Sequence, residues 1–213
     1  MKSVLHFFVA AGTLAVILQA PLATAQIVTP ALKTPAVPSN LEVPKGNMLF
    51  LAGHAQGTQN YICLPSAGTF AWTFFSPTAT LFQDFQLGPI DIHQQIITHF
   101  LSPNPEEKGT SRVTWQSSID SSAVWAKLAT NGSSTDRNFV AEGAIPWLLL
   151  EEVGTFRAPN NGEILSHTTY VQRLNTGGGV APSAGCSEAS NVGATALVPY
   201  SADYYFYKAI PPQ

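Results

Sequence analysis

Charged side chains are scarce in this chain of 213 residues, at 11% of the total. Ten Lys and Arg stand against thirteen Asp and Glu, which gives a formal net charge of −3. Proteins that bind nucleic acid usually gather positive charge on one surface to neutralise phosphates. The sequence holds no such basic cluster and therefore predicts no nucleic-acid partner.

Long hydrophobic runs are lacking after the N-terminal region. The chain starts with Lys2, continues through an apolar run from Val4 to Leu18 and then reaches Ala23-Thr-Ala25. This order is typical of a cleavable secretory signal peptide, residues 1–25. The alternative is a membrane anchor, but the run of about fifteen residues is shorter than the ~20 that span a bilayer. We predict a secreted, extracellular protein with no membrane span in the mature chain.

Cysteine is nearly absent, with Cys63 and Cys186 as the two examples. In an oxidising compartment an even pair normally forms a disulfide. The chain-entropy model gives about 4–5 kcal/mol as an upper estimate for closing so long a loop. The alternative is two free thiols or an intermolecular bridge.

A convincing amphipathic helix is lacking too. Residues 26–47 hold four prolines, which fix φ and lack an amide donor, and this predicts a Pro-rich extended arm. From residue 48 onward, aromatic and β-branched runs are separated by turn residues, as in strands. We expect residues 48–213 to form one all-β domain, an antiparallel sandwich or barrel of about nine or ten strands with little helix. The expected runs are 48–52, 59–63, 69–75, 78–85, 89–101, 112–116, 123–128, 145–151, 164–174 and 195–208.

The run 89–101 alternates with a period of two. One predicted face carries Ile90, Ile92, Gln94, Ile96, Thr98 and Phe100 and is expected to meet the core. The other, wetter face carries Asp91, His93, Gln95, Ile97, His99 and Leu101. Three of these, Asp91, His93 and His99, are titratable. These types can bind zinc or copper, but His93 and His99 would lie about 20 Å apart along a straight strand. A polar face with one buried, hydrogen-bonded histidine is therefore the simpler interpretation.

Several blocks together resemble a known family. In chain order they are NYIC at 60–63, FAW at 70–72, TH at 98–99, VTW at 113–115, IPWLLL at 145–150, YVQR at 170–173, TGGGVAP at 176–182 and PYSADYYFY at 199–207. The chain is similar over nearly all of its mature length to exported fungal and bacterial proteins catalogued as domain of unknown function 3455. The resemblance implies export and names no activity. Some fungal members carry an automated malate dehydrogenase label.

That label is tested on the glycine-rich segment. A dinucleotide site needs Gly-x-Gly-x-x-Gly between a strand and a helix, so that backbone amides meet the pyrophosphate. Gly177-Gly-Gly179 is the sole candidate; Pro182 occupies the third glycine position, and no helical pattern follows. We reject the nicotinamide interpretation and expect no cofactor.

Two charges stand in the most distinctive strands, Arg173 and Asp203. A charge among apolar strand residues is costly unless it is paired. We predict that the two are neighbours or bind backbone carbonyls. The functional alternative is that Arg173 recognises an anionic ligand. Trp115 and the other tryptophans are expected in the core, with a carbohydrate-stacking surface as the alternative.

The sequence favours a secreted module of the extracellular space or cell wall with a binding or structural role. A wall glycan or a small ligand is its candidate partner, and Arg173, Trp115 and Asp203 are its candidate binding residues. The alternative is a secreted hydrolase or metal-dependent enzyme that uses His99, as catalytic group or metal ligand, with a carboxylate such as Asp91. Asn131-Gly-Ser133, placed in a polar loop, is the one predicted N-glycosylation site.

Overall fold

The structure is a computed structural model that describes residues 27–28 and 31–211. The predicted signal peptide and its cleavage after Ala25 lie outside the described residues. Within them, nine strands and three short 3-10 helices occur in the order β1 (Ile27–Val28), η1 (Ser39–Leu41), β2 (Asn47–Ser66), β3 (Thr69–Leu87), β4 (Ile90–Asn104), η2 (Pro105–Glu107), β5 (Thr110–Ser117), β6 (Ala123–Ser134), β7 (Trp147–Phe156), β8 (Thr168–Gly178), η3 (Ala189–Asn191) and β9 (Thr195–Ala209).

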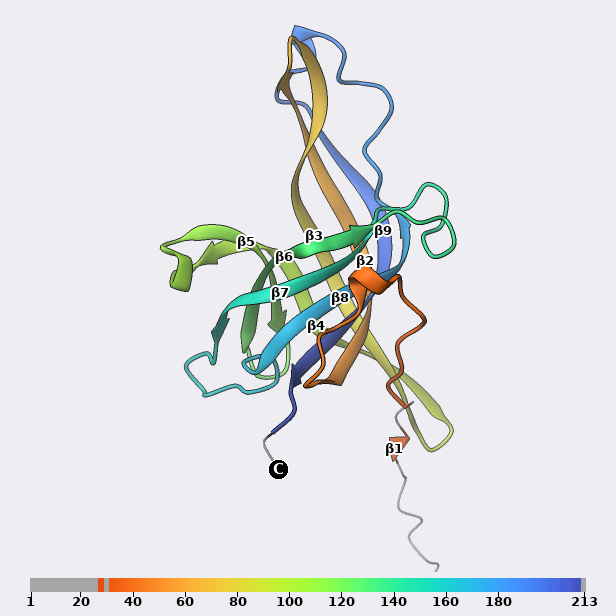
Figure 1. Cartoon of the computed structure of the whole chain (residues 1–213), viewed down its shortest axis with the longest axis vertical. Helices are drawn as coiled ribbons and strands as arrows, with labels where there is room; N and C mark the ends of the chain where they lie inside the picture. Colours follow the sequence, from red (N-terminus) through yellow and green to blue (C-terminus); the bar gives the residue numbers. More distant parts are fainter. Residues whose placement is uncertain (1–26, 29–30, 212–213) are drawn as a thin grey trace, which may run out of the picture.

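Eight of these strands close into an antiparallel barrel. From β2 to β9 each strand pairs with the next one in the chain, and β9 pairs back with β2 (Figure 1). The short β1 adds to β3, where Ile27 pairs with Leu87. The all-β prediction is confirmed, and of the two expected architectures the structure has the barrel.

Two expected pairs of strands are each a single long strand. β2 contains the runs 48–52 and 59–63, and β3 contains 69–75 and 78–85. Gly57 lies in the middle of β2, between the two runs. A Cβ atom on Gly57 would come 2.1 Å from the carbonyl oxygen of Thr78. The close approach of β2 to β3 therefore requires this glycine.

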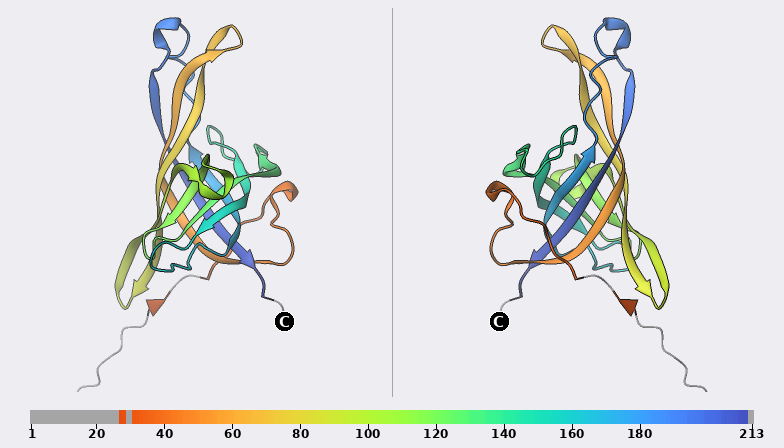
Figure 2. Two further views of the ribbon diagram at one scale, coloured as in Figure 1. Left: turned by 90° about the vertical axis from the view of Figure 1, so that its left-hand side faces the viewer. Right: turned by 90° about the vertical axis from the view of Figure 1, so that its right-hand side faces the viewer.

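The β2–β3 hairpin projects from one end of the barrel, and the β3–β4 hairpin projects from the other (Figure 2). Ala67 and Gly68 connect β2 to β3 with φ of 47° and 82°. Two positive φ values in a two-residue loop match the twist of paired antiparallel strands. Near this tip Cys63 forms a disulfide with Cys186, with 5.5 Å between their Cα atoms, which confirms the predicted pairing.

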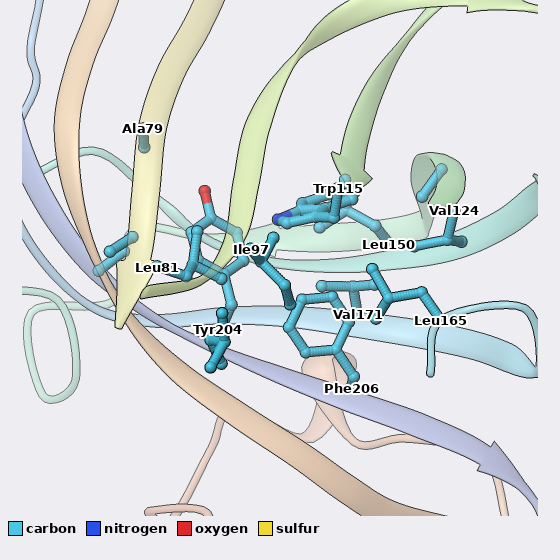
Figure 3. Close-up of a cluster of buried hydrophobic side chains, with 14 of the residues drawn as sticks. Ala79, Leu81, Ile97, Trp115, Val124, Leu150, Leu165, Val171, Tyr204 and Phe206 are labelled. Atoms are coloured by element: carbon cyan, nitrogen blue, oxygen red, sulfur yellow. The ribbon is translucent and has the colours of Figure 1, made fainter. Parts of the chain in front are cut away.

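The barrel interior is filled by side chains from strands that are far apart in the sequence. Leu81, Ile97, Trp115, Tyr204 and Phe206 point toward one another from β3, β4, β5 and β9 (Figure 3). Each of the five is at most 1% exposed. Burial of such large apolar groups contributes roughly 1.5–3 kcal/mol per side chain. This cluster is the main core of the fold.

A second cluster lies on the outside of the barrel wall. Leu41 of η1 is fully buried and packs there with Trp147, Tyr205 and Tyr207. Gln172 fixes this contact, because its Nε2 donates to the Leu41 carbonyl oxygen at 2.6 Å and its Oε1 accepts from the Tyr207 hydroxyl at 2.7 Å. The Pro-rich segment thus covers β6 to β9, which explains why Tyr205 and Tyr207 are buried although they face away from the barrel interior.

The predicted faces of β4 are wrong beyond its middle. Leu81 pairs with Ile97 and Phe82 pairs with Gln95, so Ile96 is an extra residue that forms a bulge. A bulge shifts the alternation of the strand by one residue. Ile97 and His99, expected on the wetter face, therefore point into the barrel.

Candidate functional site

A cavity of about 270 Å³ opens at the end of the barrel where β7 begins and β8 ends. Apolar side chains from β3, β5 and β7, together with the segment before β7, form much of its wall. These are Phe74, Pro77, Val113, Ile145, Leu148 and Leu150. The mouths of barrels are common sites for small ligands, and such sites pair apolar walls with a few polar groups.

His99 reaches this cavity from β4. Its ring stacks on Trp115 with 4.3 Å between centroids, and its Nδ1 lies 2.8 Å from the carbonyl oxygen of Thr114. Since a carbonyl only accepts, Nδ1 is the donor and Nε2 holds a lone pair. Burial lowers the pKa of His99 to about 3, the Thr114 bond opposes this, and the charge of Arg173 adds to it. The imidazole is therefore neutral at physiological pH.

Arg173 lines the same cavity from β8, whereas Asp203 faces the outside of the barrel. One guanidinium nitrogen, Nη2, donates to the carbonyl oxygen of Pro146 at 2.9 Å. Asp203 instead accepts from His54 at 2.8 Å and from Asn175 at 2.7 Å. The sequence predicted either that the two charges are neighbours or that they bind backbone carbonyls. Arg173 binds a backbone carbonyl, and the two charges lie on opposite faces of the barrel wall.

Two further N–H donors in the cavity wall have no hydrogen-bond partner among the described residues. They are Nε1 of Trp115 and Nε2 of Gln59, on side chains that are 1% and 3% exposed. Nε of Arg173 is buried and unpartnered in the same way. Buried donors are nearly always bonded in folded proteins, so each such group calls for an explanation.

Hydroxyl groups complete the polar part of the wall. Tyr61 donates to the carbonyl oxygen of Gly179 at 2.6 Å, and the hydroxyl of Tyr204 lies 3.3 Å from that of Tyr200, which does not line the cavity itself. Gly179 has φ of +80°, and a Cβ atom there would lie 3.0 Å from Gln59 and Ile145. A glycine is therefore needed at position 179, because the backbone there passes close to side chains beside the cavity.

The remaining candidates for catalysis lie elsewhere. Asp91 is exposed on the projecting β3–β4 hairpin and accepts from Gln86 at 2.9 Å. His93, also exposed, pairs with Asp84. The bulge at Ile96 separates both from His99. Within residues 27–28 and 31–211, no group of three or more metal-ligating side chains comes together.

The tryptophans offer little surface for stacking a sugar. Trp115, Trp125 and Trp147 are buried, and Trp72 is half-buried with its Nε1 donating to Ala184. Asn131 is exposed, but it lies in an irregular part of β6 rather than in a loop. Its carbonyl oxygen accepts from Asn40 at 2.8 Å.

A larger opening of about 470 Å³ lies at the opposite end of the barrel, lined in part by Phe50, Ile164 and Lys208. None of its lining side chains carries a buried polar atom without a partner, as far as the described chain goes. The first cavity is therefore the better candidate site. The sequence did not identify Gln59 and Tyr61 as site residues, because neither residue type stands out in a β-strand. Their spacing of two, which places both side chains on one face of the strand, was the available signal.

A family model described as a protein of unknown function, DUF3455, matches residues 44–208. The match runs from just before β2 nearly to the end of β9, so it includes the cavity. No curated protein and no solved structure matches the chain. In the part of the chain that the structure describes, no helix is long and apolar enough to cross a membrane.

Proposed function

The chain belongs to the DUF3455 family, whose description names no activity, and we propose from the cavity itself that it is a binding protein for a small molecule. The observation that carries this proposal is an apolar cavity inside a closed barrel whose wall keeps unpartnered N–H donors. Apolar walls supply affinity, and a few polar groups fix the orientation of a ligand.

A hydrolase would need a carboxylate beside His99 to orient or assist it. Among the described residues that line the cavity there is no Asp or Glu. His99 is also already bonded through Nδ1 to a backbone carbonyl. These contacts support binding in preference to catalysis.

We also propose that the protein works outside the cell. The N-terminal signal pattern, the Cys63–Cys186 disulfide and the exposed Asn131 sequon support this together. After expression with its own N-terminus in yeast, the medium should contain a chain that begins at Gln26. A glycosidase-sensitive mass on Asn131 is expected there. Retention in the cytosol with an intact N-terminus would contradict secretion.

The binding proposal is tested by filling the cavity. Octanamide, a neutral probe, and octanoate should each bind the wild-type protein with one-to-one stoichiometry in titration calorimetry. Leu148→Trp adds an indole to the cavity wall and should abolish both. Leu128→Trp, at a site on β6 that is 49% exposed, is the matched control and should bind as the wild type does. No heat from either probe, or unchanged binding to Leu148→Trp, would refute the proposed function.

A further inference from the structure

Arg173 differs from the other arginines in what it pairs with. The chain has four, and Arg112, Arg137 and Arg157 each form an ion pair with a glutamate. Arg173 forms none within the described residues, and these contain every Asp and Glu side chain of the sequence. Its protein partner is the neutral carbonyl oxygen of Pro146.

The guanidinium charge is thus left uncompensated beside an apolar cavity. Its effect reaches four neighbours, because it acts to lower the pKa of His99, Tyr61, Tyr200 and Tyr204. For the three tyrosines burial is the larger effect and raises the pKa. None of the four is an anion at neutral pH. A buried cation without an anion is costly, so the cavity favours a ligand that brings a negative charge.

Three buried polar atoms in this wall lack a hydrogen-bond partner among the described residues, and all three are donors. Nε of Arg173, Nε1 of Trp115 and Nε2 of Gln59 have hydrogens to donate, and no acceptor among the described residues meets hydrogen-bond geometry with them. A ligand group that accepts several hydrogen bonds and carries charge would satisfy them at once. A carboxylate has two oxygens, can accept from an arginine fork in parallel and forms stronger bonds than a neutral acceptor.

We propose that the cavity binds a small carboxylic acid, with its carboxylate on Arg173, Trp115 and Gln59 and its apolar body against Leu148 and Leu150. This inference rests on the proposed function and adds the class of ligand. A single arginine with no lysine in the lining suits a monoanion better than a phosphate dianion. A liquid water occupies ~30 Å³, so the cavity of about 270 Å³ suits a molecule of about ten non-hydrogen atoms.

The test compares octanoate with octanamide, which has the same shape and a neutral head. At pH 7 the acid is ionised. The wild-type protein should bind octanoate about 10- to 100-fold more tightly than octanamide, as a charge-assisted contact implies. Arg173→Met should lose this preference and bind both probes as the wild type binds octanamide. Arg137→Met, at an exposed arginine, should keep it.

Equal affinity of the wild-type protein for the two probes would overturn the carboxylate inference and leave small-molecule binding intact. A preference for octanoate that survives in a folded Arg173→Met would overturn it as well. The absence of binding by either probe would instead remove the proposed function. The comparison of probes on the wild-type protein needs no variant, so it decides the matter even if Arg173→Met does not fold. Trp115→Phe, which keeps an aromatic side chain and removes the N–H donor, should weaken octanoate binding more than octanamide binding.

Discussion

Replacing Cys63 and Cys186 by alanine is expected to lower the free energy of unfolding by about 4 kcal/mol. The bridge joins residues 123 positions apart, and the chain-entropy model gives about 4–5 kcal/mol for a loop of this length as an upper estimate. Alanine is the suitable replacement, because Cys63 is fully buried and serine would leave a hydroxyl there. Denaturant unfolding of the wild type and the double variant measures the difference.

The bridge has two backbone companions. The amide of Cys63 donates to Ala194 at 2.9 Å, and the amide of Gly193 donates to Cys63 at 3.0 Å. Without the disulfide these two bonds and the one from Nε1 of Trp72 to Ala184 hold the segment before β9 to the β2–β3 hairpin, so proteolysis should begin in residues 180–194. Wild-type protein kept in a reductant is the control and should match the double variant. Equal unfolding free energies for all three would contradict the assigned role of the bridge.

Acid should destabilise the protein through His99. The unfolded histidine takes up a proton near pH 6.5, whereas burial keeps the folded one neutral down to a pKa of about 3. The unfolded state therefore binds more protons in this interval. The contribution of His99 to the stability of the folded state is present above pH 6.5 and is lost as the pH falls toward 3. Between pH 6.5 and 4.5 the loss should be roughly 2–3 kcal/mol.

This interval separates His99 from Glu107 and Asp120, the two carboxylates whose pKa is lowered. Hydrogen bonds from Arg112 and Asn104 lower the pKa of Glu107 to about 2, and that of Asp120 is also about 2 because hydrogen bonds outweigh its burial. Their contributions to stability begin to fade when the pH falls to the ordinary carboxyl pKa of about 4 and are lost toward pH 2. His99→Asn should flatten the pH dependence of denaturant unfolding between pH 7.5 and 4.5. The control His167→Asn, at an exposed site, should leave it unchanged.

A direct check uses the wild-type protein alone. The imidazole carbon shifts of His99 in NMR spectra should stay constant from pH 8 to pH 5. Titration of His99 near pH 6.5 would show that the ring is reached by water and would contradict its placement in the barrel interior. The same result would also remove the reason for a neutral Nε2 in the cavity.

The sequence predicted the class of fold because its signals are local. Aromatic and β-branched runs, turn residues and the absence of a helical period define strands wherever they occur. Strand faces depend on register, and one extra residue at Ile96 moved His99 from the predicted outer face to the interior. The residues 89–101 contain no signal that predicts this bulge, because its cause is the pairing with β3.

The site was predicted in its parts and not in its assembly. Arg173, His99 and Trp115 were all singled out, yet they come from β8, β4 and β5 and meet only when the barrel closes. The sequence also left open whether Arg173 lies near Asp203. Their positions on paired strands allow contact, and only the facing of each residue, Arg173 inward and Asp203 outward, excludes it.

Whether a carboxylate lies against Arg173 and Trp115 can be decided by titrating ¹⁵N-labelled protein with octanoate at pH 7. The indole N–H of Trp115, assigned with Trp115→Phe, should shift progressively and saturate as its unpartnered donor gains an acceptor. The indole of Trp125, which already donates to Ser102 at 2.8 Å, should not move and serves as the internal control. A Trp115 indole signal that stays fixed while octanoate reaches saturation would contradict the binding mode proposed for the barrel cavity.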